Sequence, residues 1–177
     1  LLRDGRKMYA YHFEGYWKDV GTISSLWEAN MEVLDPEHSG INLFDENWKI
    51  YSRNSGMTGH KIGSNAVVEN SMITDGCRID GSIKHSILFS GVKVEKGAKI
   101  EDAVVMGKTV IKAGAVVEHC IVAENVVIGE NAVVGSMPKG EEHGVATIGS
   151  GITIGKGAKI GPNAMVNKNV EDGEEQW

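Results

Sequence analysis

The sequence is poor in proline, cysteine and aromatic residues, and it has no excess of basic charge. Of its 177 residues, 3 are proline, 2 are cysteine and 6% are aromatic, while 18 Lys and Arg stand against 24 Asp and Glu. A protein that binds nucleic acid needs a concentrated basic surface, so the net charge of -6 argues against such a partner. No apolar run approaches the ~20 residues of a membrane-spanning helix, so we expect no membrane partner.

The two cysteines, Cys77 and Cys120, are too few for a disulfide framework. Both lie at positions of a repeat described below, where a thiol serves as a small buried hydrophobic side chain. This usage predicts a reducing compartment. The first ten residues, LLRDGRKMYA, lack an initiator Met and do not resemble a signal peptide, so we expect them to continue a longer polypeptide.

The composition changes near residue 60, where a mixed segment gives way to a repetitive one. In the mixed segment, residues 7–13 (KMYAYHF) alternate and are rich in aromatic side chains, which predicts a strand. Residues 37–60 have mixed polarity and several turn-forming residues. They predict a linker, with one short strand at residues 48–52 (WKIYS).

Residues 24–36 (SSLWEANMEVLDP) predict a helix. Ser25 and Glu28 have the spacing of a capping box, and Pro36 marks the expected end. The apolar side chains of this segment recur with helical spacing, so that they would share one face. They are Leu26, Trp27, Met31 and Leu34.

From Ile62 onward the sequence repeats. The segments VENSMI, IKHSIL, IEDAVV and VEHCIV begin at residues 68, 83, 100 and 117, which gives steps of 15, 17 and 17. Glycine or asparagine often stands three residues after an apolar anchor and is followed by a small residue, as in Gly97–Ala98 and Asn131–Ala132. Glycine and asparagine tolerate the positive φ of a sharp corner, and a small side chain fits inside that corner.

Three such six-residue units make one triangular turn, and successive turns stack as parallel strands. The alternative, a β-sandwich, would show two-residue alternation with turns every ~8–12 residues, so the six-residue spacing favours a parallel β-helix. Residues 135–147 (GSMPKGEEHGVAT) interrupt this spacing. We expect part of this stretch to project from a corner as a loop.

A motif outside the repeat carries the clearest chemical signal. Residues 15–22 read GYWKDVGT, and the helix with the sequence WEAN follows. Together with the repeat at this distance, this combination closely resembles the ADP-glucose pyrophosphorylase (glucose-1-phosphate adenylyltransferase) family over roughly residues 7–135. Related sugar-1-phosphate nucleotidyltransferases share the Trp-x-Asp-x-Gly-Thr core but not the whole combination.

The resemblance implies a mainly β fold. It is a left-handed parallel β-helix of hexapeptide repeats, preceded by a short strand-helix remnant of an α/β nucleotidyltransferase domain. In this division, residues 1–36 are the C-terminal remnant of the catalytic domain, residues 37–60 are a linker, and residues 61–177 are the β-helix domain.

The resemblance also implies roles for residues of the motif. Asp19 would be catalytic as a carboxylate ligand of Mg²⁺, and Trp17, two residues earlier on the same face of a strand, would line the glucose pocket. The metal ion would neutralise charge as glucose 1-phosphate attacks the α-phosphate of ATP and releases pyrophosphate. Gly21 would allow a sharp turn beside this site, and Lys18 would point to the opposite face. Without the resemblance, Trp17 is interpreted as a core residue and Asp19 as a helix cap.

For the whole protein, the resemblance implies a cytoplasmic enzyme of glycogen synthesis that uses ATP and glucose 1-phosphate. It also implies a homotetramer with an allosteric activator site, for which Lys93 is the candidate basic residue. Gly91 stands close to where relatives carry an arginine, which leaves the identity of the activator open. The family's Gly-rich nucleotide segment, sugar-phosphate lysine and second metal carboxylate do not occur among these residues, so we expect no activity from this part alone.

Other interpretations stay open at the level of the sequence. The protein could be a pyrophosphorylase for another nucleotide sugar, such as the UDP-GlcNAc or GDP-mannose enzymes, or a non-catalytic regulatory paralogue of an active subunit. A hexapeptide-repeat acyltransferase would need a general base, for which His119 is the candidate. A zinc carbonic anhydrase would need three converging histidines, and the repeat holds His85, His119 and His143. Because His85 and His119 occupy matching places in their coils, we expect a solvent-facing or packing role for each.

Overall fold

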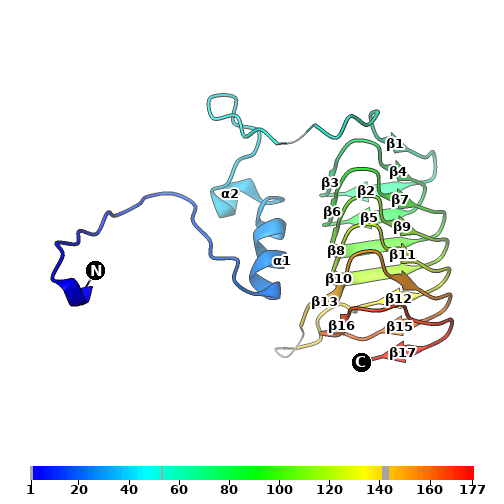
Figure 1. The fold of residues 1–177 in the computed structure, drawn as a ribbon. Coiled ribbons are helices and arrows are strands. Elements are labelled where there is room, and N and C mark those ends of the chain that lie inside the picture. The colour runs from blue at the N-terminus through cyan, green and yellow to red at the C-terminus, as the bar shows by residue number, and fades with distance from the viewer. Residues whose placement is uncertain (1, 53, 141–143) are drawn as a thin grey trace.

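The computed structural model contains a three-sided solenoid of short strands, preceded by an extended segment and a helix that lies against one side of the solenoid (Figure 1). The structure describes residues 2–52, 54–140 and 144–177. The helices that precede the solenoid are a 3₁₀ helix η1 (Leu2–Asp4), α1 (Ile23–Glu32) and α2 (Pro36–Ser39). None of the helices in these described ranges is long and apolar enough to cross a membrane.

The strands of the solenoid form three faces, and each strand pairs in parallel with the strand of the next coil. The first face consists of β1 (Lys61–Ile62), β4 (Arg78–Ile79), β7 (Lys93–Val94), β9 (Val110–Ile111), β11 (Val127–Ile128) and β14 (Thr153–Ile154). The second face consists of β2 (Val67–Glu69), β5 (Ser82–Lys84), β8 (Lys99–Val105), β10 (Val116–Val122), β12 (Val133–Val134), β15 (Lys159–Ile160) and β17 (Glu175–Gln176). The third face consists of β3 (Met72–Ile73), β6 (Ile87–Leu88), the second halves of β8 and β10, β13 (Ala146–Ile148) and β16 (Met165–Val166).

Inward-pointing Ile and Val side chains form the core of this stack. On the first face, Ile79, Val94, Ile111, Ile128 and Ile154 lie one above another, and each is at most 1% exposed. Burial of each such side chain contributes roughly 1.5–3 kcal/mol. Most strands of the solenoid are only two or three residues long, so a single coil is stable only between neighbours. The parallel β-helix is therefore confirmed, and its hexapeptide spacing fits the left-handed form.

The corner between the second and third faces shows why the repeat has its residue pattern. Asn70, His85, Asp102 and His119 occupy this corner in successive coils, and all have positive φ, from 35° to 51°. The position that follows points inward and is small; in the last of these coils it is Cys120, which is fully buried. Cys77 is buried in the same core, and burial raises the pKa of both thiols. The prediction that both cysteines are small buried side chains is confirmed, and both are free thiols.

The register of the strands follows the predicted steps. Lys61 pairs with Arg78, Arg78 with Lys93 and Lys93 with Val110, at sequence distances of 17, 15 and 17. One coil later Val127 pairs with Thr153, a distance of 26 residues instead of 17. The interruption at residues 135–147 is thus an insertion into one coil, and the stack resumes in register after it. Residues 141–143, including the candidate His143, lie outside the described residues.

The two strands expected before the solenoid are wrong. Residues 7–13 and 48–52, all of which the structure describes, have no strand pairing. Their aromatic side chains are exposed instead, including Tyr9 and Tyr11 at 88% and 89%. A strand needs a neighbour that accepts its backbone hydrogen bonds, and among the described residues none lies beside either segment.

The predicted helix exists, but its ends differ from the prediction. The capping box is formed by Thr22 and Ser25: the Thr22 hydroxyl accepts from the Ser25 backbone N–H, and the Ser25 hydroxyl accepts from the Thr22 N–H. Ser25 and Glu28 therefore do not form the cap. Helix α1 ends at Glu32, and Pro36 opens the short helix α2 rather than closing α1. Proline fits the first turn of a helix because its missing N–H would have no partner there.

Candidate functional site

The motif at residues 15–22 forms an extended segment that leads into α1, and its side chains alternate between two sides. Tyr16 and Lys18 point to α1, where the Tyr16 hydroxyl donates to Glu32 at 2.6 Å. The Lys18 ammonium donates to Glu32 at 2.6 Å and to Glu28 at 2.9 Å. Because side chains of an extended chain alternate, Trp17 between them points away from α1.

The contact between the motif and α1 shifts the pKa of each group that takes part in it. The hydrogen bond that the Lys18 ammonium donates to Glu32, and then the one that it donates to Glu28, raise the pKa of Lys18. The Lys18 ammonium, followed by the Tyr16 hydroxyl, holds the pKa of Glu32 below its ordinary value. Glu32 in turn raises the pKa of Tyr16, because the phenol donates its proton to the carboxylate. Lys18, to which the sequence assigned no chemistry, therefore fastens the motif to α1.

The other side of the motif is open. Trp17 is 76% exposed, so it is not a core residue. Asp19 is exposed, and its carboxylate makes no hydrogen bond or ion pair with the described residues. Since Thr22 caps α1, Asp19 is not needed as a helix cap. Gly21 does not adopt positive φ, and the chain bends at the next residue, Thr22, where α1 begins.

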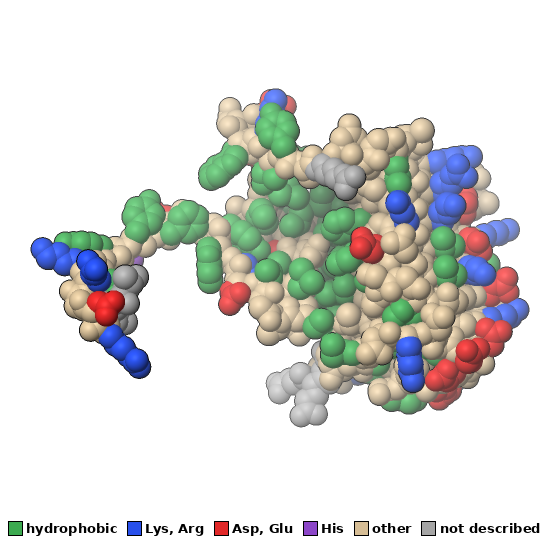
Figure 2. Space-filling model, in the orientation of Figure 1, with side chains coloured by type: hydrophobic (Ala, Val, Ile, Leu, Met, Phe, Trp, Pro, Cys, Tyr) green, Lys and Arg blue, Asp and Glu red, His purple; other side chains and the backbone are tan. Residues whose placement is uncertain are grey.

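Helix α1 is docked on the third face of the solenoid, which is unusually apolar on its outside. Met31 packs with outward-pointing Val104 and Ile121 and with Val145, and all four are at most 6% exposed. Figure 2 shows hydrophobic side chains gathered between the helix and the solenoid. The Trp27 indole N–H also donates to the backbone oxygen of Asp102 at 2.7 Å. The predicted apolar stripe of the helix therefore faces the repeat domain.

The two described repeat histidines both belong to this docking corner. His85 Nδ1 lies 2.5 Å from a carboxylate oxygen of Asp102. His119 is 7% exposed, and its ring lies 4.4 Å from the Trp27 ring, centroid to centroid. Trp27 thus covers the side chain that an acyltransferase would need as an accessible general base. Among the residues the structure describes, no group of three or more His, Cys, Asp or Glu side chains could hold a metal ion.

Comparisons with known proteins match both parts of this arrangement. The family model described as "GlmU-like, C-terminal hexapeptide" matches residues 56–155, which contain most of the solenoid. The chain belongs to this hexapeptide family. A second model, described as "Nucleotidyl transferase", matches residues 1–36, which contain the motif and α1.

Curated relatives of this hexapeptide-family chain are named glucose-1-phosphate adenylyltransferase. Those of Bacillus mycoides (strain KBAB4) and Bacillus cereus (strain ATCC 10987 / NRS 248) are 57% identical over 97 residues, which is 55% of this chain and 26% of each relative. That of Bacillus anthracis is 56% identical over the same length. The resemblance to this family is confirmed. The matched part spans about a quarter of the length of these relatives.

Lys93, the candidate activator residue, lies far from Asp19 in the fold. It is exposed on β7 of the first face, whereas α1 and the motif lie at the third face (Figure 1). The structure therefore brings Trp17 and Asp19 together on one segment but does not bring Lys93 to them. Instead, Lys93 lies in register with Arg78, which itself pairs with Lys61.

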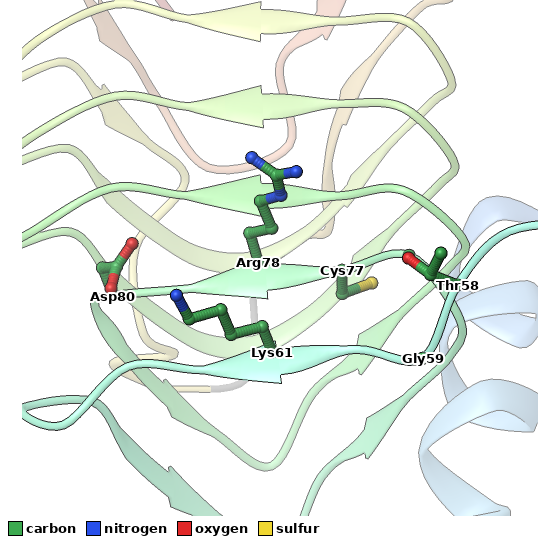
Figure 3. Close-up of a pocket in the computed structure, with 7 residues that line it drawn as sticks. Thr58, Gly59, Lys61, Cys77, Arg78 and Asp80 are labelled. Atoms are coloured by element: carbon green, nitrogen blue, oxygen red, sulfur yellow. The ribbon is translucent and has the colours of Figure 1, made fainter.

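A cavity of about 420 Å³ lies beside Lys61 and Arg78, and the sequence analysis did not single out either residue. Figure 3 shows the two side chains on adjacent strands, with Asp80 at one end and Thr58 at the other. A signal for this site was present in the sequence. The distances of 17 and 15 residues between the three basic residues equal the coil steps, which places them at one position of successive coils.

Proposed function

We propose that this chain is the C-terminal part of a glucose-1-phosphate adenylyltransferase. The whole protein would make ADP-glucose and pyrophosphate from ATP and glucose 1-phosphate, in the cytoplasm, for glycogen synthesis. The observation that carries this proposal is the order of the two family matches along the chain. The nucleotidyl transferase match comes first and contains the exposed Trp17 and Asp19, and the hexapeptide match follows and contains most of the solenoid. The names and the identity of the Bacillus relatives support it.

In this proposal Trp17 and Asp19 complete a site whose other groups lie upstream in the longer protein. The exposed indole of Trp17 offers a flat apolar surface, which suits the apolar face of a sugar ring. The Asp19 carboxylate is free of protein donors in the described residues, so both of its oxygens can serve a hard cation. Bound Mg²⁺ supplies charge neutralisation for two anionic reactants. Asp19 would hold this ion with one carboxylate, and Glu32 and Glu28 would keep the segment in place through Lys18.

The same proposal assigns a supporting role to the solenoid. It would hold α1 through Trp27, help to build a homotetramer and contribute to allosteric control, with Lys93 as a candidate effector contact. Because the nucleotide-binding groups of the family are not among these residues, the chain alone would form no ADP-glucose. A chain free of longer protein that produced ADP-glucose above the blank would contradict this assignment.

The test uses the longer protein that contains this chain and the variant Asp19→Asn. Loss of the carboxylate is expected to lower kcat about a hundredfold or more and to raise the Mg²⁺ concentration needed for half-maximal rate. The measurement is pyrophosphate release from ATP and glucose 1-phosphate, with UTP and GTP each assayed separately in place of ATP. Glu46→Gln, which removes the charge of an exposed carboxylate of the linker, is the control.

An unchanged rate in Asp19→Asn would remove this residue from the mechanism. A preference for UTP or GTP would instead assign the protein to another sugar-1-phosphate nucleotidyltransferase. No turnover with any nucleotide, in a protein that carries the upstream groups, would favour a regulatory paralogue.

A further inference from the structure

Helix α1 touches the solenoid and the motif with neighbouring residues. Trp27 and Met31 contact the solenoid. Glu28 and Glu32, which directly follow them in the chain, bind Lys18 of the motif. Successive residues of an α-helix point about 100° apart around its axis, so the two contacts lie on adjoining sides of one helix. Figure 1 shows α1 between the solenoid and the extended segment that precedes the helix, so a shift of α1 on the solenoid would also shift Lys18.

One hydrogen bond fixes the helix to a corner of the solenoid. The Trp27 indole N–H donates to the backbone oxygen of Asp102 at 2.7 Å, and the Trp27 ring packs on the ring of His119. Asp102 has a φ of 51°, as the corner requires in successive coils. Its carboxylate lies 2.5 Å from Nδ1 of His85, in the preceding coil. The carbonyl group that holds Trp27 is therefore itself held in place by the stacking of coils.

The second contact joins the helix to Asp19. Lys18 donates to Glu32 at 2.6 Å and to Glu28 at 2.9 Å, and Asp19 is the next residue of the motif. Because side chains of an extended chain alternate, the Asp19 carboxylate points away from α1 and depends on the anchored Lys18 for its position. The contacts thus form a continuous route from the solenoid corner, through α1, to Asp19.

We propose that Trp27 is a positioning residue for Asp19. This inference rests on the proposed function, in which the Asp19 carboxylate holds a divalent cation. A metal site needs its ligands held to within about 0.5 Å, and α1 passes the position of the solenoid corner on to the motif. Loss of the Trp27 hydrogen bond frees the helix to shift, which weakens the metal site although every ligand is still present. A residue that only stabilises the fold would not have this effect.

The test measures metal binding by the longer protein that contains this chain, without turnover. The probe is Mn²⁺ alone, and electron paramagnetic resonance detects the ion that remains free. Asp19→Asn should weaken saturable Mn²⁺ binding about tenfold or more, and Trp27→Phe should weaken it about fivefold, as the loss of one hydrogen bond predicts. In pyrophosphate release, Trp27→Phe should lower kcat by a similar factor and leave the KM for ATP within about twofold.

A double-mutant cycle distinguishes positioning from general stability. Lys18→Gln removes the link between α1 and Asp19, so Trp27→Phe should have no further effect on Mn²⁺ binding in that background. Additive effects of the two substitutions on the Mn²⁺ dissociation constant would show that Trp27 does not act through Lys18, and the proposal would then be wrong.

Ile154→Val is the matched control for stability. Ile154 is fully buried on the first face, away from α1, and the loss of one methylene there destabilises the solenoid without touching the helix. This variant should leave Mn²⁺ binding within about twofold of the wild type. Equal weakening by Ile154→Val and Trp27→Phe would contradict a positioning role. Circular dichroism spectra confirm that each variant is folded.

The outcomes separate this inference from the proposed function. Unchanged Mn²⁺ binding in Trp27→Phe, together with loss of binding in Asp19→Asn, would overturn the positioning role and leave the proposed function standing. Unchanged binding in Asp19→Asn would overturn the metal role of Asp19, and the positioning role with it.

Discussion

At the scale of single residues, the alternation of side chains along residues 15–22 places some of them against α1 and leaves others exposed. Tyr16 and Lys18 hold the segment to Glu28 and Glu32 of α1. Trp17, one position from each, is left exposed. The sequence places Lys18 on the side opposite to Trp17, and the structure shows that this side fixes the position of the segment rather than leaving it solvated.

Replacement of Glu32 by Gln tests this division. The variant removes the charge that Tyr16 and Lys18 share, so residues 16–19 should become mobile on the nanosecond timescale, with backbone order parameters below ~0.6 in ¹⁵N relaxation experiments. Glu28→Gln is the control, because Lys18 keeps its shorter hydrogen bond to Glu32. In the wild type the same contact is present above the ordinary Glu pKa of 4.5 and is lost as the pH falls through the depressed pKa of Glu32. Order that persists in Glu32→Gln would contradict the role given to this carboxylate.

At the scale of elements, the contact between α1 and the solenoid is the feature that joins the two parts of the chain. The helix places Met31 on Val104 and Ile121, and Trp27 on the corner formed by Asp102 and His119. Side chains at these outward positions would face water in an isolated solenoid. The contact therefore buries apolar surface from both parts, and it carries the motif along with the helix.

Substitution of Trp27 measures this contact. Trp27→Phe keeps an aromatic ring but removes the indole donor to Asp102, which should cost about 1 kcal/mol. Amide exchange in α1 should then accelerate about fivefold, while the amides of the solenoid should stay unchanged, because its core does not include the helix. Trp27→Ala should have a larger effect, of about 2 kcal/mol or more.

Hydrogen exchange followed by mass spectrometry resolves α1 from the coils. Trp48→Phe, at an exposed site of the linker, is the matched control and should leave both regions unchanged. Equal acceleration in the coils of the Trp27 variants would show that α1 is part of one cooperative unit with the solenoid.

At the scale of the whole molecule, ion pairs between coils cover the outside of an apolar core. Lys156 pairs with Glu130 at 2.9 Å, and Lys159 pairs with Glu175 at 2.6 Å. The lysine partners lower the pKa of Glu130 and Glu175, and Glu130 raises the pKa of Lys156. All of these groups are on the surface, so each pair contributes little and is screened by salt.

These shifts predict how stability depends on pH. A carboxylate with a lowered pKa stabilises the fold above its ordinary value of 4.5, and this contribution is lost as the pH falls through the depressed value. A lysine with a raised pKa stabilises the fold below 10.5, and this contribution is lost as the pH rises through the raised value. Burial raises the pKa of Cys77 and Cys120 above the ordinary thiol value of 9.0, so the fold also loses stability above pH 9.0, where only the unfolded chain ionises these thiols. The Tm from circular dichroism should therefore be nearly level between pH 4.5 and 9.0 and fall on either side. A Tm that rises on acidification below 4.5, or an acid slope that about 1 M salt leaves unchanged, would contradict this.

The repeat domain could be predicted from the sequence in detail because its signal is local and is renewed in every coil. The sequence predicts that anchors such as Ile111 and Ile128 point inward and that corner residues such as Asn131 adopt positive φ. In the structure both anchors are buried, and Asn131 has positive φ. The segment that precedes the repeat domain has no pattern that recurs along the chain. Residues 7–13 have the composition of a strand, but a strand is defined by its neighbour, and composition does not show whether that neighbour is present.

The sequence by itself determined the stacked coils, the burial of both cysteines and the helix that carries Trp27, because each follows from spacing along the chain. The tertiary structure decided which distant residues meet. It placed Trp27 on the corner of Asp102 and His119, and it placed Tyr16 and Lys18 on Glu32. The physical reason is that the docking of a helix is set by packing between segments, and this packing joins side chains whose separation along the chain carries no simple period.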